Sequence, residues 1–173
     1  KVARAIDLAP NAELIAIASR HPSRAASWAA ARDIERSYGS YDALLEDPEI
    51  DAVYIPLPPS LHREWTIQAA EKSQHVLCEK PMALSLAELR AIEDVSRENN
   101  VWIVEAYAYM HHPQLQRIIE LIESNDLGDI YQFTGWDTFP LPDSDSNYRF
   151  DVTMGGGSLW DIGVYPVSLA IVL

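Results

Sequence analysis

Short apolar segments alternate with helical segments along residues 1–106, and this alternation constrains the fold more than any other feature of the sequence. The apolar segments span residues 13–19, 51–55, 75–78 and 101–105, and the first of them suits a strand that is buried on both faces. Helical patterns of about 12 residues separate them. This order predicts βαβ units with right-handed crossovers and a parallel sheet, and therefore an α/β fold.

Capping residues and apolar stripes place the helices between these strands. Ser23 can cap a helix over residues 24–38, with Trp28 and Ile34 on its inward stripe and Gly39 at its end. Residues 85–88 read Ser-Leu-Ala-Glu, a capping box that opens a helix to about residue 97. Further helices are predicted over residues 1–9 and 61–72, with a short one around residues 44–45.

The pattern changes near residue 107, where we place a domain boundary between residues 1–106 and 107–173. A helix over residues 114–124 is followed by an alternating stretch, residues 130–139, which is typical of a half-exposed antiparallel strand. A polar loop then leads to three glycines and a last helix. The chain begins inside a helix, whereas a doubly wound sheet begins with a strand, so we expect the middle part of a longer protein.

Composition excludes several classes of protein. The net charge of −13 argues against a nucleic-acid partner, which would require lysine and arginine to neutralise phosphates. No run of about 18 apolar residues is present, so no membrane span is expected. The single cysteine, Cys78, excludes an internal disulfide and a multi-cysteine zinc site, so we expect no metal site and a reducing, cytoplasmic location.

Two groups of residues could carry chemistry. Glu79 and Lys80 directly follow an apolar strand, at the sheet edge where open α/β folds bind ligands. Asp161 and Tyr165 follow three glycines and share one face of a helix, because they are four residues apart. Each group also has a structural interpretation, as ordinary loop charges or as a solvated carboxylate beside a core tyrosine.

Two further segments point to a nucleotide. Ser19 and Arg20 follow the first strand, where a dinucleotide-binding fold reads the adenosine ribose, and no acidic residue lies between Ala18 and Asp33. If the fold prediction holds, this pattern favours NADP over NAD, because an acidic residue there would favour NAD. The prolines of residues 56–59 could wall a flat ligand, whereas the nearby His62 is more often a cap or a packing residue.

Taken together, these segments resemble the glucose–fructose oxidoreductase/inositol dehydrogenase/MocA family of NAD(P)-dependent oxidoreductases. The strongest match is the pair Glu79-Lys80-Pro81 and Gly155-Gly156-Gly157 with Asp161-Ile162-Gly163-Val164-Tyr165. Weaker matches cover residues 51–62, 105–113 and 147–149. Tyr165 stands where many members have histidine, which is similar to the branch that contains dimeric dihydrodiol dehydrogenase and NADP-linked xylose dehydrogenase.

The resemblance implies a fold and a function. The fold is a Rossmann-type parallel sheet that lacks its first strand and Gly-rich loop, followed by the beginning of an α+β domain whose sheet also forms homo-oligomers. The function is NADP(H)-dependent hydride transfer to or from a sugar, polyol or dihydrodiol, with NAD as the alternative cofactor. A non-catalytic nucleotide- or sugar-binding relative, and an inactive fragment of the enzyme, are the alternatives.

The resemblance also assigns roles to particular residues. It implies catalytic positions at Lys80, Asp161 and Tyr165, and cofactor contacts at Ser19, Arg20, Leu57, Pro58, His62, Glu79 and Lys80.

For the chemistry we expect Tyr165 to act as the general acid. A Lys80 ammonium about 4 Å away, at an effective dielectric constant of about 20, would favour the phenolate by roughly 4 kcal/mol. This interaction would lower the pKa of Tyr165 from about 10 to near 7, provided that Asp161 lies farther away. Asp161 itself would bind a substrate hydroxyl or orient Lys80.

Overall fold

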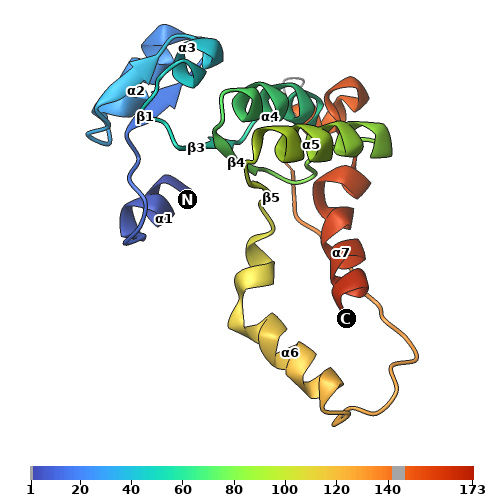
Figure 1. Cartoon of the computed structure of the whole chain (residues 1–173). Coiled ribbons are helices and arrows are strands. Elements are labelled where there is room, and N and C mark those ends of the chain that lie inside the picture. Colours follow the sequence, from blue (N-terminus) through green and yellow to red (C-terminus); the bar gives the residue numbers. More distant parts are fainter. Residues whose placement is uncertain (1, 142–146) are drawn as a thin grey trace.

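The computed structural model describes residues 2–141 and 147–173 (Figure 1). Strands and helices alternate through the first part of the chain. In order, the elements are α1 (Val2–Leu8), β1 (Ala16–Ala18), α2 (Pro22–Ala30), β2 (Arg36–Tyr38), α3 (Tyr41–Leu45), β3 (Ala52–Ile55), α4 (His62–Glu71), β4 (His75–Cys78), α5 (Leu86–Asn99) and β5 (Ile103–Glu105). The second part holds α6 (Pro113–Glu123), a π-helix (Leu159–Gly163) and α7 (Val164–Val172), with short 3₁₀ turns between them.

The strands form two parallel sheets, as the alternation predicts. β1 pairs with β2, and β3, β4 and β5 pair in that order. A doubly wound sheet has the strand order 3-2-1-4-5-6. β1 and β2 correspond to strands 2 and 3 of that order, and β3, β4 and β5 correspond to strands 4, 5 and 6. Among the described residues, no strand pairs with the remaining edges of β1 and β3. The Rossmann-type α/β fold is therefore confirmed.

The main core lies between the three-stranded sheet and the two helices α4 and α5, which lie side by side (Figure 1). Ile55, Val76 and Cys78 of the sheet pack there with Ala69 of α4 and Ile92 of α5. The opposite face is open: Leu77 is 38% exposed and Val104 is 46% exposed. The predicted burial of the strand that ends at Cys78 therefore holds for only one face of β4. Successive right-handed crossovers in one direction place both helices on the same face of the sheet.

The predicted helix over residues 24–38 is also wrong in its second half. α2 begins at Pro22 with His21 at the N-cap position, and it ends at Ala30. Asp33 then adopts a left-handed conformation with φ 54°, which stops the helix. Residues Arg36–Tyr38 form β2 instead, because pairing with β1 satisfies their backbone groups. The Tyr38 hydroxyl donates to Asp47 at 2.7 Å and anchors this strand.

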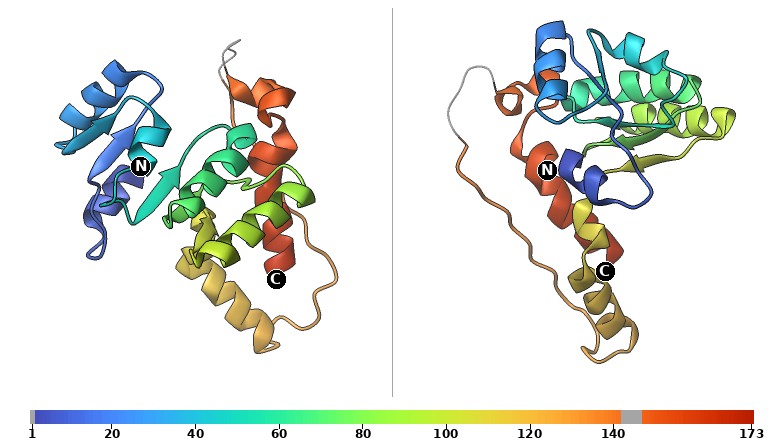
Figure 2. Two further views of the ribbon diagram at one scale, coloured as in Figure 1. Left: turned by 45° about the horizontal axis from the view of Figure 1, so that its top comes forward. Right: turned by 90° about the vertical axis from the view of Figure 1, so that its left-hand side faces the viewer.

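The predicted antiparallel strand over residues 130–139 does not form. These residues are exposed, and among the described residues none forms a strand ladder with them. They run as a long extended segment between α6 and the last turns (Figure 2). A strand requires a partner for its backbone groups, and the alternating sequence alone does not supply one. Tyr131 and Trp136 in this segment are 92% and 80% exposed.

The last helix changes type where Pro166 would disturb it. A π-helix over Leu159–Gly163 gives way to α7 at Val164, so the proline stands in the first turn of the α-helix. Pro166 has no N–H to donate, and the backbone oxygen of Asp161, five residues before it, accepts a hydrogen bond from Lys80 instead. None of the helices in the described ranges has the length and apolarity that crossing a membrane requires.

Candidate functional site

The carboxyl edge of the three-stranded sheet gathers three loops. Leu57 follows β3, Lys80 follows β4 and Tyr107 follows β5. Because the strands are parallel, all three loops leave the sheet on the same side. The Gly155–Gly157 segment packs against the first of these loops, because a Cβ on Gly155 would lie 2.7 Å from Cβ of Pro59. Residues from both parts of the chain therefore meet at this edge.

Lys80 and Asp161, which are 81 positions apart in the sequence, form an ion pair. The Nζ atom of Lys80 donates to the backbone oxygen of Asp161 and to its Oδ1 atom, the latter at 3.2 Å. The two side chains are only 12% and 9% exposed. This pair supports an orienting role for Asp161 toward Lys80, one of the two roles expected from the sequence.

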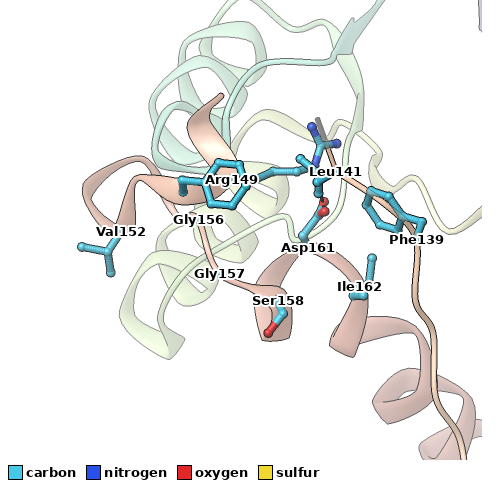
Figure 3. A pocket seen from close by; sticks show the side chains of 10 residues that line it. Phe139, Leu141, Arg149, Val152, Gly156, Gly157, Ser158, Asp161 and Ile162 are labelled. Atoms are coloured by element: carbon cyan, nitrogen blue, oxygen red, sulfur yellow. Dashed lines mark hydrogen bonds and ion pairs between the residues drawn. The ribbon is translucent and has the colours of Figure 1, made fainter. Parts of the chain in front are cut away.

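Arg149 completes this cluster, although the sequence analysis assigned it no role. Its Nε atom donates to Oδ2 of Asp161 at 2.7 Å, so one carboxylate serves two cations. Figure 3 shows the two side chains beside a cavity of about 460 Å³, whose apolar lining includes Phe139 and Ile162. The Asn-Tyr-Arg motif at residues 147–149 marked this segment, but it did not show which carboxylate Arg149 contacts.

Tyr165 lies next to Lys80, in an aromatic cluster. The Nζ atom of Lys80 is 5.2 Å from the centre of the Tyr165 ring. Tyr107 and Tyr109 meet the same ring edge-on, at centroid distances of 5.6 and 6.1 Å. The Tyr109 hydroxyl shares a 2.7 Å hydrogen bond with Ser168, whose hydroxyl donates to the backbone oxygen of Tyr165. These contacts fix the backbone and the ring of Tyr165.

The electrostatic environment of Tyr165 differs from the expectation. Burial raises the pKa of its hydroxyl, and the nearby carboxylates Glu79, Asp161 and Asp137 raise it further. The predicted lowering toward 7 is therefore wrong for this structure. Lys80 directs its charge to Asp161, so it does little to favour a phenolate. Tyr165 is a neutral phenol at pH 7, and in this form it can donate a proton.

The three glycines allow the chain to turn closely under this cluster. A Cβ atom on Gly156 would lie 2.5 Å from the backbone oxygen of Tyr148 and 2.7 Å from those of Arg149 and Asp151. The N–H groups of Gly156 and Gly157 donate to Asp151 and Arg149. The close approach predicted for these glycines is thus an approach to the backbone of residues 148–151, which holds Arg149 beside Asp161.

Glu79 and Glu105 face different partners at the same edge. Oε1 of Glu79 accepts a 2.6 Å hydrogen bond from the Tyr54 hydroxyl, a partner that the sequence analysis did not identify. Oε1 of Glu105 accepts the backbone N–H of Met82 at 2.7 Å, and burial raises the pKa of this carboxyl group. Both carboxylates therefore brace the loop that carries Lys80.

The remaining predicted cofactor contacts are divided between surface and interior. Leu57 and Pro58 are partly buried at the end of β3, whereas His62 is fully buried, with 0% exposure, and hydrogen-bonds to backbone oxygens. Ser19 accepts the backbone N–H of His21 at the start of α2. Arg20 lines a second pocket of about 430 Å³, which also includes Ser40, Asp42 and Trp65.

The predicted cofactor contacts are spread along the carboxyl ends of the strands, which fits an elongated ligand. Arg20 stands after β1 and Lys80 after β4, where a doubly wound fold holds the two ends of a dinucleotide. The acidic residues Asp42 and Glu64 also line the Arg20 pocket, so its charge is mixed. Among residues 2–141 and 147–173, no group of three or more metal-ligating side chains is placed to hold an ion.

Comparisons with known proteins cover nearly the whole chain. The family model described as an oxidoreductase family with an NAD-binding Rossmann fold matches residues 1–107. The GFO/IDH/MocA C-terminal domain matches residues 115–173. Both models belong to the family that the motifs resemble, so that resemblance is confirmed.

Individual relatives are sugar oxidoreductases. The NADP(+)-dependent D-xylose 1-dehydrogenase 2 of Haloferax volcanii is 44% identical over 158 residues, which are 91% of this chain and 48% of the relative. The dTDP-3,4-didehydro-2,6-dideoxy-α-D-glucose 3-reductase of Saccharopolyspora spinosa is 41% identical over 91% of this chain and 47% of the relative.

A solved structure agrees with these sequences. The 3-ketoreductase KijD10 from Actinomadura kijaniata, in complex with NADP and TDP-benzene, has a TM-score of 0.88 and 35% identity, over 96% of this chain and 51% of the other. The chain spans about half the length of the curated relatives it matches. From its two matching domains, the chain belongs to the GFO/IDH/MocA family of oxidoreductases.

Proposed function

We propose that the chain is part of an NADP(H)-dependent oxidoreductase that transfers a hydride to or from a sugar, polyol or dihydrodiol. The observation that carries the proposal is the placement of Lys80, Asp161 and Tyr165 together at the carboxyl edge of the sheet. A titratable phenol beside an ammonium group is the equipment of a proton-transfer site. The relatives named above supply the class of reaction, because they are NADP-linked or act on sugars.

The proposal assigns a step to each residue. Bound NADP(H) would supply or accept the hydride. Tyr165, kept neutral by burial and by three carboxylates, donates its hydroxyl proton to the substrate oxygen during carbonyl reduction. Asp161 holds Lys80 in place, and Lys80 keeps its ammonium group beside the Tyr165 ring.

Cofactor binding extends along the same edge. Arg20, in its pocket after β1, would receive the 2′-phosphate of NADP, with Ser19 holding the turn that presents it. Leu57, Pro58 and Glu79 would line the cofactor between this pocket and Lys80. His62 lies beneath them in the interior, so its contribution would be indirect.

Residues 1–106 would form the cofactor domain, and residues 107–173 would begin the substrate domain, whose sheet would join copies of the complete protein. The buried Cys78 thiol and the lack of any other cysteine support a reducing, cytoplasmic location.

Oxidation of NADPH tests the activity. We expect absorbance loss at the NADPH band with one of a panel of aldoses, keto sugars and dihydrodiols. The Tyr165→Phe variant should lower kcat by about 10²–10⁴-fold while retaining NADPH affinity. NADPH binding without turnover on any substrate would favour a non-catalytic relative, and unchanged kcat in Tyr165→Phe would refute the assigned role.

A second comparison tests the fragment interpretation. NADPH binding by the 173-residue chain would be compared with binding by a version that is extended upstream by about 30 residues. This is about the length of one βαβ unit. Equal affinity would rule out a contribution of an upstream phosphate-binding segment. Much weaker binding by the shorter chain would show that the activity requires the longer protein.

A further inference from the structure

Three tyrosines from two distant parts of the chain pack ring to ring beside Lys80. Tyr107 and Tyr109 belong to a 3₁₀ turn and its N-cap, after β5, whereas Tyr165 lies in the first turn of α7. Each pair of rings meets edge-on, with centroids 5.6, 5.6 and 6.1 Å apart. Such edge-to-face pairs are a favourable arrangement of aromatic rings. The turn after β5 therefore packs directly against the phenol ring of Tyr165.

Two hydrogen bonds continue from Tyr109 to the backbone of Tyr165. The hydroxyl oxygens of Tyr109 and Ser168 are 2.7 Å apart, and Oγ of Ser168 is 3.0 Å from the backbone oxygen of Tyr165. A backbone oxygen only accepts hydrogen bonds, and a serine hydroxyl has a single proton. Ser168 therefore donates to Tyr165 and accepts from Tyr109. The result is a directed chain from the Tyr109 hydroxyl through Ser168 to the Tyr165 carbonyl group.

The backbone around Tyr165 makes fewer helical hydrogen bonds than a regular helix does. The next residue, Pro166, has no N–H to donate. The backbone oxygen of Asp161, in the preceding turn, accepts a hydrogen bond from Lys80. The helix also changes from π to α type one residue before Tyr165. A contact with a group outside the helix therefore matters more for the position of Tyr165 than it would in a regular helix.

Tyr109 is that outside group. A serine in a helix often bonds to a carbonyl oxygen of its own preceding turn, and such a bond alone has only local meaning. Tyr109, however, lies 59 positions before Ser168, and its hydroxyl favours the Ser168 rotamer that reaches Tyr165. Tyr109 is itself held in its turn, because its backbone oxygen accepts the N–H of His112.

We propose that Tyr109 and Ser168 form a latch that sets the position of the Tyr165 phenol, so that both are positioning residues for proton transfer. Tyr109 acts through its ring, which packs against the phenol, and through its hydroxyl, which acts on the Tyr165 backbone. Because its turn follows β5, the latch also ties α7 to the sheet edge from which Lys80 extends. The importance of the latch for turnover rests on the proposed function, whereas the direction of the hydrogen bonds does not.

The sequence allows the carbonyl group of Tyr165 to be observed on its own. Tyr165 is the only one of the eight tyrosines that precedes a proline. Nuclear magnetic resonance of the 173-residue chain, with ¹³C in its tyrosine carbonyl groups and ¹⁵N in its prolines, should therefore give a single directly bonded ¹³C–¹⁵N pair, at Tyr165–Pro166. The carbonyl shift of this pair reports the hydrogen bond that the latch makes.

Removing one hydroxyl at a time tests the latch. Ser168→Ala should move the Tyr165 carbonyl signal to lower frequency, because the carbonyl oxygen loses its donor. Tyr109→Phe keeps the ring and should move the signal in the same direction by a smaller amount, because a hydroxyl that accepts a hydrogen bond is the stronger donor. Tyr131→Phe is the matched control on a side chain that is 92% exposed, and it should leave the signal in place. A signal in Tyr109→Phe that coincides with that of the unmodified protein would refute the latch.

Turnover of NADPH by the complete protein tests the positioning. Tyr109→Phe should lower kcat by about two- to tenfold, the effect of one lost hydrogen bond, with the KM for NADPH unchanged. Ser168→Ala should lower kcat similarly, and Ser168→Thr, which keeps the hydroxyl, should recover most of the loss. In a Tyr165→Phe background, Tyr109→Phe should have no further effect, because the hydroxyl that the latch positions is absent.

Two kinetic results would overturn the positioning role. One is an unchanged kcat in Tyr109→Phe, and the other is an equal further loss of kcat when Tyr109→Phe is added to Tyr165→Phe. Failure of every substrate to react would count against the proposed function instead, and the carbonyl signal would still decide whether the latch forms.

Discussion

Replacing Asp161 with asparagine would leave two cations facing a neutral group. Oδ1 of Asp161 is 3.2 Å from the Lys80 ammonium and Oδ2 is 2.7 Å from Nε of Arg149. At an effective dielectric constant of about 20, these distances correspond to gross attractions of about 5 and about 6 kcal/mol. Desolvation of the three charges offsets much of this attraction while all three are present.

The Asp161→Asn variant loses the attraction of the carboxylate for Lys80 and Arg149. Most of the free-energy cost of desolvating these two cations remains. Removing one partner of a buried pair costs about 3–5 kcal/mol, because an uncompensated charge remains. Arg149 is 35% exposed and can turn toward water, whereas Lys80 is 12% exposed and cannot do so as easily. We therefore expect Asp161→Asn to lower the unfolding free energy by about 3 kcal/mol, the lower end of that range.

Urea unfolding followed by tryptophan fluorescence measures this loss. Glu46→Gln is the matched control, because it makes the same carboxylate-to-amide change in a Glu46–Lys72 pair whose side chains are 67% and 44% exposed. The control should cost about 0–1 kcal/mol. Equal losses in the two variants, with equal dependence on urea, would show that burial of the Asp161 cluster adds nothing and would refute the reasoning.

Three more predictions follow from packing and titration. Gly156→Ala should lower the unfolding free energy by about 1–3 kcal/mol, since its Cβ would lie 2.5 Å from the Tyr148 oxygen; an unchanged melting temperature would contradict this. Burial raises the pKa of Tyr107 to about 12, so the unfolded chain loses protons first above about pH 10, and the unfolding free energy should fall from pH 10 to 12; a smaller fall in Tyr107→Phe would confirm the source. The Cys78 thiol, with its pKa raised to about 12 by burial, should react with a disulfide reagent only after unfolding, and rapid reaction in the folded protein would disprove its protection.

The sequence predicted the parallel α/β fold because that fold depends on local patterns. Apolar strands, capping residues and their order along the chain were enough to place β3 to β5 and α4 and α5. The predicted Ser85 cap forms, whereas the predicted Ser23 cap does not, because α2 begins at Pro22 with His21 at its N-cap. β2 was missed because Arg36–Tyr38 has no apolar signal, and pairing with β1 decides its conformation.

The candidate site was predicted in part. Motif resemblance named Lys80, Asp161 and Tyr165, and the structure brings these three side chains together. The direction of the Tyr165 pKa could not be predicted, because it depends on which of two nearby groups Lys80 faces. Arg149 was missed for a similar reason, since a loop arginine shows its carboxylate partner only after the chain has folded.

The Lys80–Asp161 contact also has a consequence for how the molecule assembles. It joins positions 81 apart, so the chain entropy of a long loop must be overcome before the contact stabilises anything. The neighbouring βαβ units close much shorter loops and can form first. We therefore expect the site to be among the last regions to gain protection during refolding, which makes its formation a kinetic marker that the two halves of the chain have docked.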